Sequence, residues 1–348
     1  MTKEKKILFS TIQVTALTLF VKFLGLIKQS VLAACCGATM ETDAFFLATG
    51  TMVNLSTIIF SAISISLLTI HTNVLFQQGR EASNRLINAV LKFFVPVAVV
   101  LTVIFYFFSP VIAKILAPAY QGNELAILAD YIQTMSVSFI LWCYFLTVNV
   151  VLETDKQFVQ GKGQGLFQNV FLILGAVLLY PKYGMKVLIY AFLLSGVAQC
   201  ILVTWYARDR FRIVVRSRES NGYVKRLVAV AFPLLLGNAM YEVNTIVDGQ
   251  VATSLGAGGA SILNYGATIN DMVVGVIVTS VSTVLFSHFS TWIAKNEIDM
   301  VELNLKRILE ILSLILFPIM IITSQRPMYL RVTLILRRIH LLMMKLIN

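Results

Sequence analysis

Charged residues are scarce in this chain of 348 residues. Asp, Glu, Lys and Arg together make up 13% of it, whereas a soluble domain carries about 25%. Apolar residues make up 58%. This composition excludes an ordinary soluble domain and predicts an all-α fold, a polytopic membrane helix bundle.

Residues that catalysis or metal binding would require are also few. The four cysteines lie within or at the ends of apolar segments, without the spacing of metal ligands, so we expect buried apolar side chains. Residues 160–165, QGKGQG, resemble a phosphate loop, but we expect a short loop with no strand before it and no Ser or Thr after the Lys. The outer loops are too short for the acids or His of a membrane glycosyltransferase or polymerase. The sequence therefore predicts no enzyme and no resident cofactor.

Long apolar segments account for most of the chain. Each is long enough, or nearly so, to cross about 30 Å of hydrocarbon at about 1.5 Å per residue. The basic start MTKEKK precedes an apolar stretch longer than a signal core, so we expect no cleavable signal. We predict about nine spans, at residues 7–36, 43–70, 87–113, 125–152, 166–181, 185–207, 227–255, 260–290 and 307–324.

The basic residues are unevenly divided between the loops. With the N-terminus in the cytoplasm, most loop Lys and Arg residues lie inside, and the outer loops hold only Lys114, Lys182 and Lys186. This bias is typical of cytoplasmic loops. The net charge of +11 is therefore assigned to topology and membrane lipid, and no nucleic-acid partner is predicted.

The most basic connection, residues 208–226, divides the predicted domains. An N-terminal lobe of six helices, residues 1–207, precedes it, and a partial second lobe of three helices, residues 227–324, follows. We interpret the connection as a cytoplasmic topology anchor facing anionic lipid; a dedicated lipid or partner site is the alternative. A weak repeat of residues 48–68 in residues 266–286 favours a transporter built from two similar lobes.

Two lysines interrupt the first apolar segment. A charged side chain inside a membrane costs about 2.5–3.5 kcal/mol on insertion scales and faces protein or water. Lys22 and Lys28 are about 120° apart on a helix with Gly25 between them, so one broad cavity can receive both. They predict a cationic wall for a phosphate-bearing cargo. Snorkelling or pairing with Asp43 is the alternative, and Asp43 itself suits either a substrate contact or a helix cap.

The seventh segment carries acids and amides. Asn244 and Asp248 are four residues apart and share a helix face, and Glu242 lies nearby. Carboxylate and amide oxygens in a helix with Pro233 and Gly237 are suited to hold Na⁺ or a proton. A structural hydrogen bond to a neighbouring helix is the alternative. We predict ion coupling at these three residues, with Na⁺ at Asp248.

Two stretches carry a family resemblance. Residues 23–48, FLGLIKQSVLAACCGATMETDAFFLA, resemble the first two helices of the MurJ/MviN lipid II flippases, within the multidrug/oligosaccharidyl-lipid/polysaccharide exporter superfamily. Residues 232–290 resemble the seventh and eighth helices of that family. The resemblance implies a monomeric, multi-pass protein of the bacterial cytoplasmic membrane. It also implies movement of an undecaprenyl-pyrophosphate-linked sugar to the outer leaflet by alternating access, driven by membrane potential or a cation gradient.

The resemblance also carries site residues over. The first-helix cavity arginines of the family fall on Lys22 and Lys28, and its aspartate falls on Asp43. Charge is kept, but the bidentate geometry of arginine is lost. The sodium-site acid of the family's seventh helix matches Asp248, and its partners would lie beyond the end of this chain.

Two family charges are absent here. The second-helix arginine falls near Ser56 or Thr57, and the eighth-helix arginine falls on Thr268. Lipid II remains the predicted cargo, and another lipid-linked polysaccharide unit, for capsule or exopolysaccharide, is the alternative.

The end of the chain departs from the family pattern. Residues 325–348 carry five Lys and Arg and no acid, on the side predicted to be outside. We interpret them as an aberrant, frameshifted tail after a truncated second lobe, which sequencing the gene downstream would test. Two further readings stay open: a cation-coupled small-molecule exporter, and a truncated membrane protein that binds a partner and transports nothing.

Overall fold

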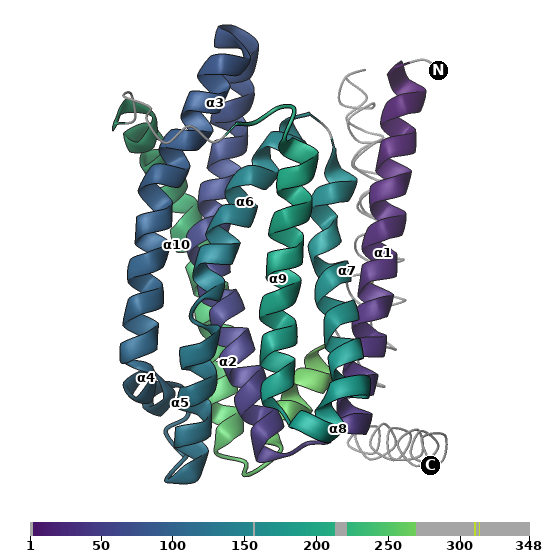
Figure 1. Ribbon diagram of the computed structural model, residues 1–348, viewed down its shortest axis with the longest axis vertical. Coiled ribbons are helices and arrows are strands. Elements are labelled where there is room, and N and C mark those ends of the chain that lie inside the picture. The colour runs from purple at the N-terminus through teal and green to yellow at the C-terminus, as the bar shows by residue number, and fades with distance from the viewer. Residues whose placement is uncertain (1–2, 156, 213–220, 269–309, 311–312, 314–348) are drawn as a thin grey trace. The chain divides into compact units, whose positions relative to one another are not determined.

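A computed structural model describes residues 3–155, 157–212, 221–268, 310 and 313. Every regular element in these residues is a helix (Figure 1), which confirms the predicted all-α membrane bundle. After the last labelled helix, residues 259–268 are also helical. The elements are α1 (Lys3–Cys35), α2 (Met40–Ser56), the π-helical η1 (Thr57–Ser61), α3 (Ala62–Phe107), α4 (Ser109–Leu116), α5 (Asn123–Met135), α6 (Ser138–Thr154), α7 (Phe158–Leu174), the π-helical η2 (Gly175–Leu179), α8 (Tyr180–Tyr183), α9 (Lys186–Ala207) and α10 (Asn221–Thr253).

Six stretches of the described residues are long and apolar enough to cross a membrane. They coincide with the first seven predicted spans, because one stretch, Met40–Phe107, contains two of them. At about 1.5 Å per residue its 68 residues are about 102 Å long, more than three bilayer cores. Most of the eighth predicted span, all of the ninth except residues 310 and 313, and the predicted tail lie outside the described residues. The other five stretches are Thr15–Cys35, Asn123–Thr154, Gly165–Tyr183, Lys186–Ala207 and Gly222–Thr253.

The long stretch reverses direction at Gly79. This residue has φ 84° and ψ 178°, a backbone conformation open to glycine and strained for other residues. The chain therefore turns tightly inside α3, and the parts before and after the turn lie in opposite directions. Figure 1 shows this hairpin at the top of the view.

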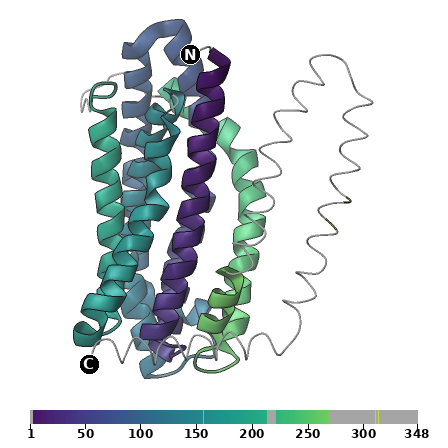
Figure 2. The same cartoon turned by 90° about the vertical axis from the view of Figure 1, so that its right-hand side faces the viewer.

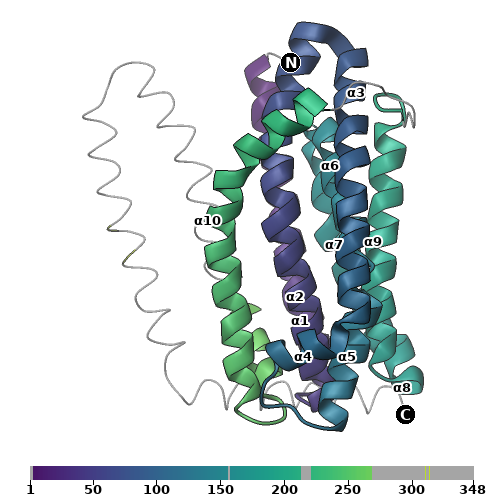
Figure 3. The same cartoon turned by 90° about the vertical axis from the view of Figure 1, so that its left-hand side faces the viewer.

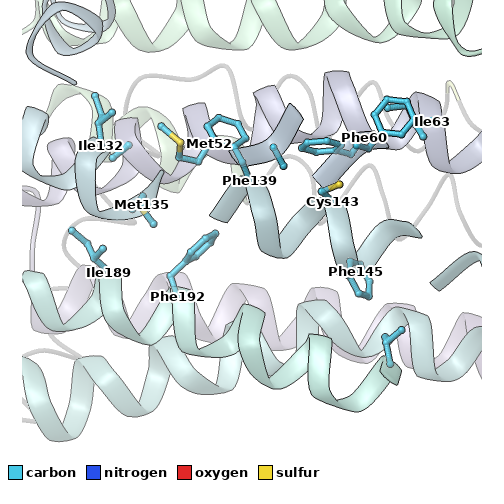
Figure 4. Packing of buried hydrophobic residues seen from close by; sticks show 14 of the residues in the cluster. Met52, Phe60, Ile63, Ile132, Met135, Phe139, Cys143, Phe145, Ile189 and Phe192 are labelled. Atoms are coloured by element: carbon cyan, nitrogen blue, oxygen red, sulfur yellow. The ribbon is translucent and has the colours of Figure 1, made fainter. Parts of the chain in front are cut away.

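The core is built around α6. This helix packs against α3 on one side and α9 on the other, and α9 in turn packs against α7. Figure 4 shows Phe139 and Cys143 of α6 pointing toward Met52 and Phe60, with Phe192 of α9 nearby. These side chains are at most 7% exposed. Large apolar side chains elsewhere stay exposed, which is how a helix surface meets hydrocarbon.

Helices α1 and α10 lie on the flanks of this core. Figures 1 and 2 show α1 alongside α7, and the two helices are in contact. Figure 3 shows α10 alongside α2, and α10 contacts α2, η1 and α3. The residues predicted to bind cargo or ions lie mostly on these flanking helices. The division into two lobes around residues 208–226 stays a prediction.

The prediction of a short loop at residues 160–165 is wrong, because these residues form part of α7. The reason is close packing of their glycines. A Cβ at Gly165 would lie 2.6 Å from Val21 Cγ1 on α1, and a Cβ at Gly161 would overlap the Asn149 amide on α6. The glycines therefore let α7 approach two neighbouring helices.

Candidate functional site

Lys22 and Lys28 are both half-buried on α1. One side of α1 between them is fixed against α7: Asn169 donates to the Val21 carbonyl at 3.1 Å, and its amide lies 3.6 Å from where a Gly25 Cβ would be. Seven residues make almost two helical turns, so Lys22 lies on the same face as Gln29. Gln29 donates to Asn264, in the helical segment after α10. Lys22 therefore lies on the side of α1 that carries the contact between Gln29 and Asn264.

Asp43 is fully buried and hydrogen-bonded from several sides. Its carboxylate accepts the Gly258 N–H at 2.6 Å, the Ser261 N–H at 2.7 Å and the Ser261 hydroxyl. The Tyr120 hydroxyl donates to it at 3.5 Å. A carboxylate at the N-terminus of the helix at residues 259–268 meets unpaired N–H groups and the positive end of the helix dipole. The bonds from Gly258 and Ser261 satisfy a charge that would otherwise be costly to bury.

The helix cap expected of Asp43 is therefore present, but on a different helix. Helix α2 begins at Thr39, whose hydroxyl accepts the Thr42 N–H at 3.3 Å. Asp43 lies in the first turn of α2 and caps a helix more than 200 residues later. Burial raises the pKa of Tyr120, and the nearby carboxylates of Asp43 and Glu124 raise it further. The Tyr120 hydroxyl therefore stays a neutral donor. A direct cargo contact for Asp43 stays a prediction.

Further hydrogen bonds join the same two parts of the chain. Gln29 donates to Asn264 at 2.6 Å, and Tyr265 donates to the Gly37 carbonyl at 3.0 Å. We refer to residues 29–43 and 258–265, joined in this way, as the clasp. Gly258 has φ 92°, and a Cβ there would lie 2.8 Å from the Ala38 carbonyl oxygen. The backbones at the clasp approach so closely that only glycine suits that position.

The three predicted ion-coupling residues of α10 face different ways. Asn244 donates to Asp248 at 3.4 Å, and both side chains are exposed. Glu242 is half-buried and faces Asn54 of α2. One turn earlier on α10, Asn238 donates to the Ser61 hydroxyl at 3.2 Å. The structure therefore pairs Asn244 with Asp248 as predicted, and it does not bring Glu242 to them.

A polar network beside the Gly79 turn of α3 was not found from the sequence. The Thr154 hydroxyl donates to the Val150 carbonyl, so it accepts the Nδ1 proton of His71 at 2.9 Å. The Ser83 hydroxyl then donates to His71 Nε2 at 2.5 Å. His71 is thus a neutral ring bridging α3 and α6, buried at 2% exposure. A lone histidine in an apolar run gives no sequence signal for such a bridge.

Beside this network, Asp155 accepts two arginines. Arg210 lies 2.7 Å from it and Arg80 lies 3.6 Å away. Arg210 also donates to Gln157 at 3.1 Å. These ion pairs join the ends of α6 and α9 to the turn in α3. Among the described residues, no group of three His, Cys, Asp or Glu side chains is placed to hold a metal ion.

These features define a class: an α-helical, multi-pass membrane protein with a transporter-like fold. Among solved structures, the fold is similar to "Lipid II flippase MurJ, inward closed conformation", with a TM-score of 0.69 and 20% identity, covering 80% of this chain and 59% of that one. It is also similar to an inward-facing multidrug resistance MATE family transporter of the MOP superfamily, with a TM-score of 0.64 and 14% identity, covering 84% of this chain and 68% of that one.

Residues 32–328 match the family described as "Lipid II flippase MurJ", and the chain belongs to that family. The "Probable lipid II flippase MurJ" of Treponema pallidum (strain Nichols) is 26% identical, covering 91% of this chain and 62% of the relative. That of Buchnera aphidicola subsp. Acyrthosiphon pisum (strain APS) is 24% identical, covering 86% and 59%. The chain thus spans less than two thirds of these curated relatives.

Proposed function

We propose that this protein moves a polyprenyl-pyrophosphate-linked saccharide from the inner to the outer leaflet of the bacterial cytoplasmic membrane. The preferred cargo is lipid II, the peptidoglycan precursor, because that is what the names of its relatives specify. The protein acts as a monomer with its N-terminus in the cytoplasm. It catalyses no covalent reaction.

The observation that carries this proposal is the pair of half-buried lysines in α1. A lysine ammonium is a point charge with three donors, which suits a pyrophosphate approached from several directions. Lys22 lies on the same face of α1 as Gln29, the residue that donates to Asn264. Lys28 lies closer to the clasp, so the two charges can follow a diphosphate along α1.

In this proposal, breaking and re-forming the hydrogen bonds of the clasp provides the alternating access. While Asp43 and Gln29 hold residues 258–264, that end of the passage is closed. Release of the cargo toward the outer leaflet requires these hydrogen bonds to break and the opposite end to close. The driving force is a membrane potential or a Na⁺ or H⁺ gradient.

Neutral residues at two family arginine positions leave a second cargo open. Ser56, near one of those positions, is buried, and Thr268 occupies the other. Fewer cations suit a lipid-linked unit with a smaller anionic load, such as a capsule or exopolysaccharide precursor. A cation-coupled exporter remains the alternative that the MATE-like fold favours, and a partner-binding protein without transport is the third.

An in-cell flipping assay tests the proposal. We expect Lys22→Ala to reduce lipid II exposure at the outer leaflet at least tenfold, because the pyrophosphate loses a charge partner. Lys182→Ala, at an exposed lysine of a connecting helix, is the matched control and should change nothing. Transport unaffected by Lys22→Ala would reject the role of the lysine, and no transport by the unaltered chain would favour the third reading.

A further inference from the structure

A cavity of about 170 Å³ lies between α3 and α10, close to the Gly79 turn. It is lined by Ile70, Asn73, Val74, Gln77 and Gln78 of α3 and by Tyr223 and Arg226 of α10. Positions 70, 73, 74 and 77 recur at the spacing of one helix face. Tyr223 and Arg226 are three residues apart and also share a face. Two helix faces turned toward each other therefore enclose the cavity.

The walls of the cavity carry hydrogen-bond donors around one positive charge. Asn73, Gln77 and Gln78 each end in an amide with two N–H donors, and these side chains are exposed. The Tyr223 hydroxyl donates to Gln78 Oε1 at 3.1 Å, which leaves the N–H donors of that amide to other partners. Arg226 adds a guanidinium with five donors. Among the residues that the structure describes, Arg226 forms no ion pair.

These groups suit a phosphate with a single negative charge. A guanidinium binds two phosphate oxygens with parallel N–H donors, and amide donors can satisfy the remaining oxygens. The lining residues include one cation and no acid. A bound cation would thus be repelled by Arg226 without a carboxylate to offset the repulsion, whereas a phosphodiester balances its charge.

The cavity is far from the lysines proposed to hold the cargo. Gln77 lies 34 residues after Asp43, and Lys22 lies 13 residues before Cys35. Measured from the connection between α1 and α2, these separations are about 51 Å and about 20 Å, so the two levels differ by roughly 30 Å. The bilayer with its headgroups is about 40–45 Å thick, which puts the cavity at headgroup level. Figure 1 shows the N-terminal end of α1 and the turn of α3 at the same end of the protein.

Apolar side chains around the cavity favour a lipid as the carrier of the phosphate. Ile70 and Val74 are buried where they line it. Val230, one turn after Arg226 on α10, is exposed, and Phe76 is 81% exposed. An acyl chain can lie on such a surface while the phosphate next to it is held by the guanidinium. Basic pockets between membrane helices at the cytoplasmic side are typical headgroup sites.

We propose that Arg226 and the amides of Asn73, Gln77 and Gln78 bind the phosphate of an anionic phospholipid. The bound headgroup joins α3 to α10 at the end of α3 that lies away from the clasp. In the sequence, Arg226 ends the basic connection at residues 208–226, for which a topology anchor and a dedicated lipid or partner site were both open. The cavity selects a lipid site at the last residue of that connection. The inference goes beyond the proposed function, because the headgroup binds whether or not a cargo is present.

The test measures binding of a fluorescent phosphatidylglycerol to the purified full chain in a neutral detergent. We expect Arg226→Gln to weaken binding at least tenfold, because it removes the only charge among the lining residues. Arg226→Lys keeps the charge but loses the planar fork, so it should bind more weakly than the unaltered chain and more tightly than Arg226→Gln. Lys225→Gln is the matched control, since Lys225 is exposed and does not line the cavity.

Unlabelled competitors identify the source of the phosphate. We expect phosphatidylglycerol to displace the probe and phosphatidylcholine to displace it poorly, because its choline cation meets no acid here. Displacement by millimolar glycerol 3-phosphate would overturn the assignment to a lipid in favour of a soluble phosphate ester.

Three other results would overturn the proposal. Undiminished binding by Arg226→Gln would exclude the cavity, and an equal loss in Lys225→Gln would show attraction to diffuse surface charge. Equal displacement by phosphatidylcholine would show that the protein contacts only the acyl chains. Thermal unfolding of each variant without the probe establishes that it is folded. Since the assay contains no cargo, a negative result leaves the proposed transport to its own test.

Discussion

Asp43 is the side chain whose neutralisation we expect to be most costly. Asp43→Asn replaces a carboxylate that accepts two backbone N–H groups with an amide whose oxygen accepts one of them while its NH₂ group faces the other. We expect a loss of about 1.5–3 kcal/mol of unfolding free energy, the range for hydrogen bonds to a charged group. Chemical unfolding in detergent measures it. Asp209→Asn is the matched control, since Asp209 is 84% exposed, and an equal loss there would contradict the prediction.

The sequence predicted which kind of contact a residue makes, but seldom which residue it contacts. The pattern at Thr42 and Asp43 indicated a helix cap, yet the capped helix begins more than 200 residues later, which no local pattern specifies. Asn244 and Asp248 pair as their spacing predicts, because four residues on one helix fix that contact. The partner of Glu242 depends on how α10 packs against α2, and helical spacing alone does not contain this information.

The packing of α7 against its neighbouring helices depends on its glycines. Gly165→Ala places a Cβ 2.6 Å from Val21 Cγ1, and a β-branched valine has little freedom to rotate away. We expect overpacking to lower the unfolding free energy by about 1–3 kcal/mol. Gly237→Ala in α10 meets no atom within 4 Å, so it should be neutral or stabilising by up to about 1 kcal/mol. Equal effects of the two substitutions would refute close packing of α1 on α7.

The His71 ring bridges α3 and α6 through its hydrogen bonds to Ser83 and Thr154. His71→Phe fills a similar volume but leaves Ser83 and Thr154 without their ring partners. We expect amide hydrogen exchange in residues 79–83 to increase at least tenfold, because the turn loses its tie to α6. Asn73→Leu, at an exposed position two residues away, is the control. Unchanged protection at the turn in His71→Phe would show that the ring only fills space.

The helices could be predicted from the sequence because a long apolar run is what a helix in hydrocarbon requires. The first seven predicted spans coincide with helices to within a turn or two at most ends. The error at residues 160–165 arose because three closely spaced glycines favour a loop in isolation. Packing against α1 and α6 selects glycine for its lack of a side chain, and the helix is stabilised by its neighbours.

For the whole molecule, the decisive question is whether the clasp opens during transport. The Gln29 and Asn264 side chains meet at 2.6 Å across the clasp, so a short bifunctional thiol reagent can bridge cysteines at these two positions. We expect the pair Gln29→Cys and Asn264→Cys to stop flipping when it is cross-linked by a bis-methanethiosulfonate and to recover it with reductant. Each single substitution treated with the same reagent is the control. Full transport by the cross-linked protein would reject alternating access through the clasp.

The stretch from Met40 to Gln78 has a mechanical consequence. It runs helically from the clasp to the turn at Gly79, with only η1 altering its winding. At about 1.5 Å per residue it is a rod about 58 Å long. The rod is tied at one end through Asp43 and at the other through His71, and α10 leans on it between them. If the proposed transport cycle tilts this rod, freeing one end moves the other end as well. The π-helical turn is then the pivot, and α2 with the first half of α3 would act as a lever that sets both ends of the proposed passage together.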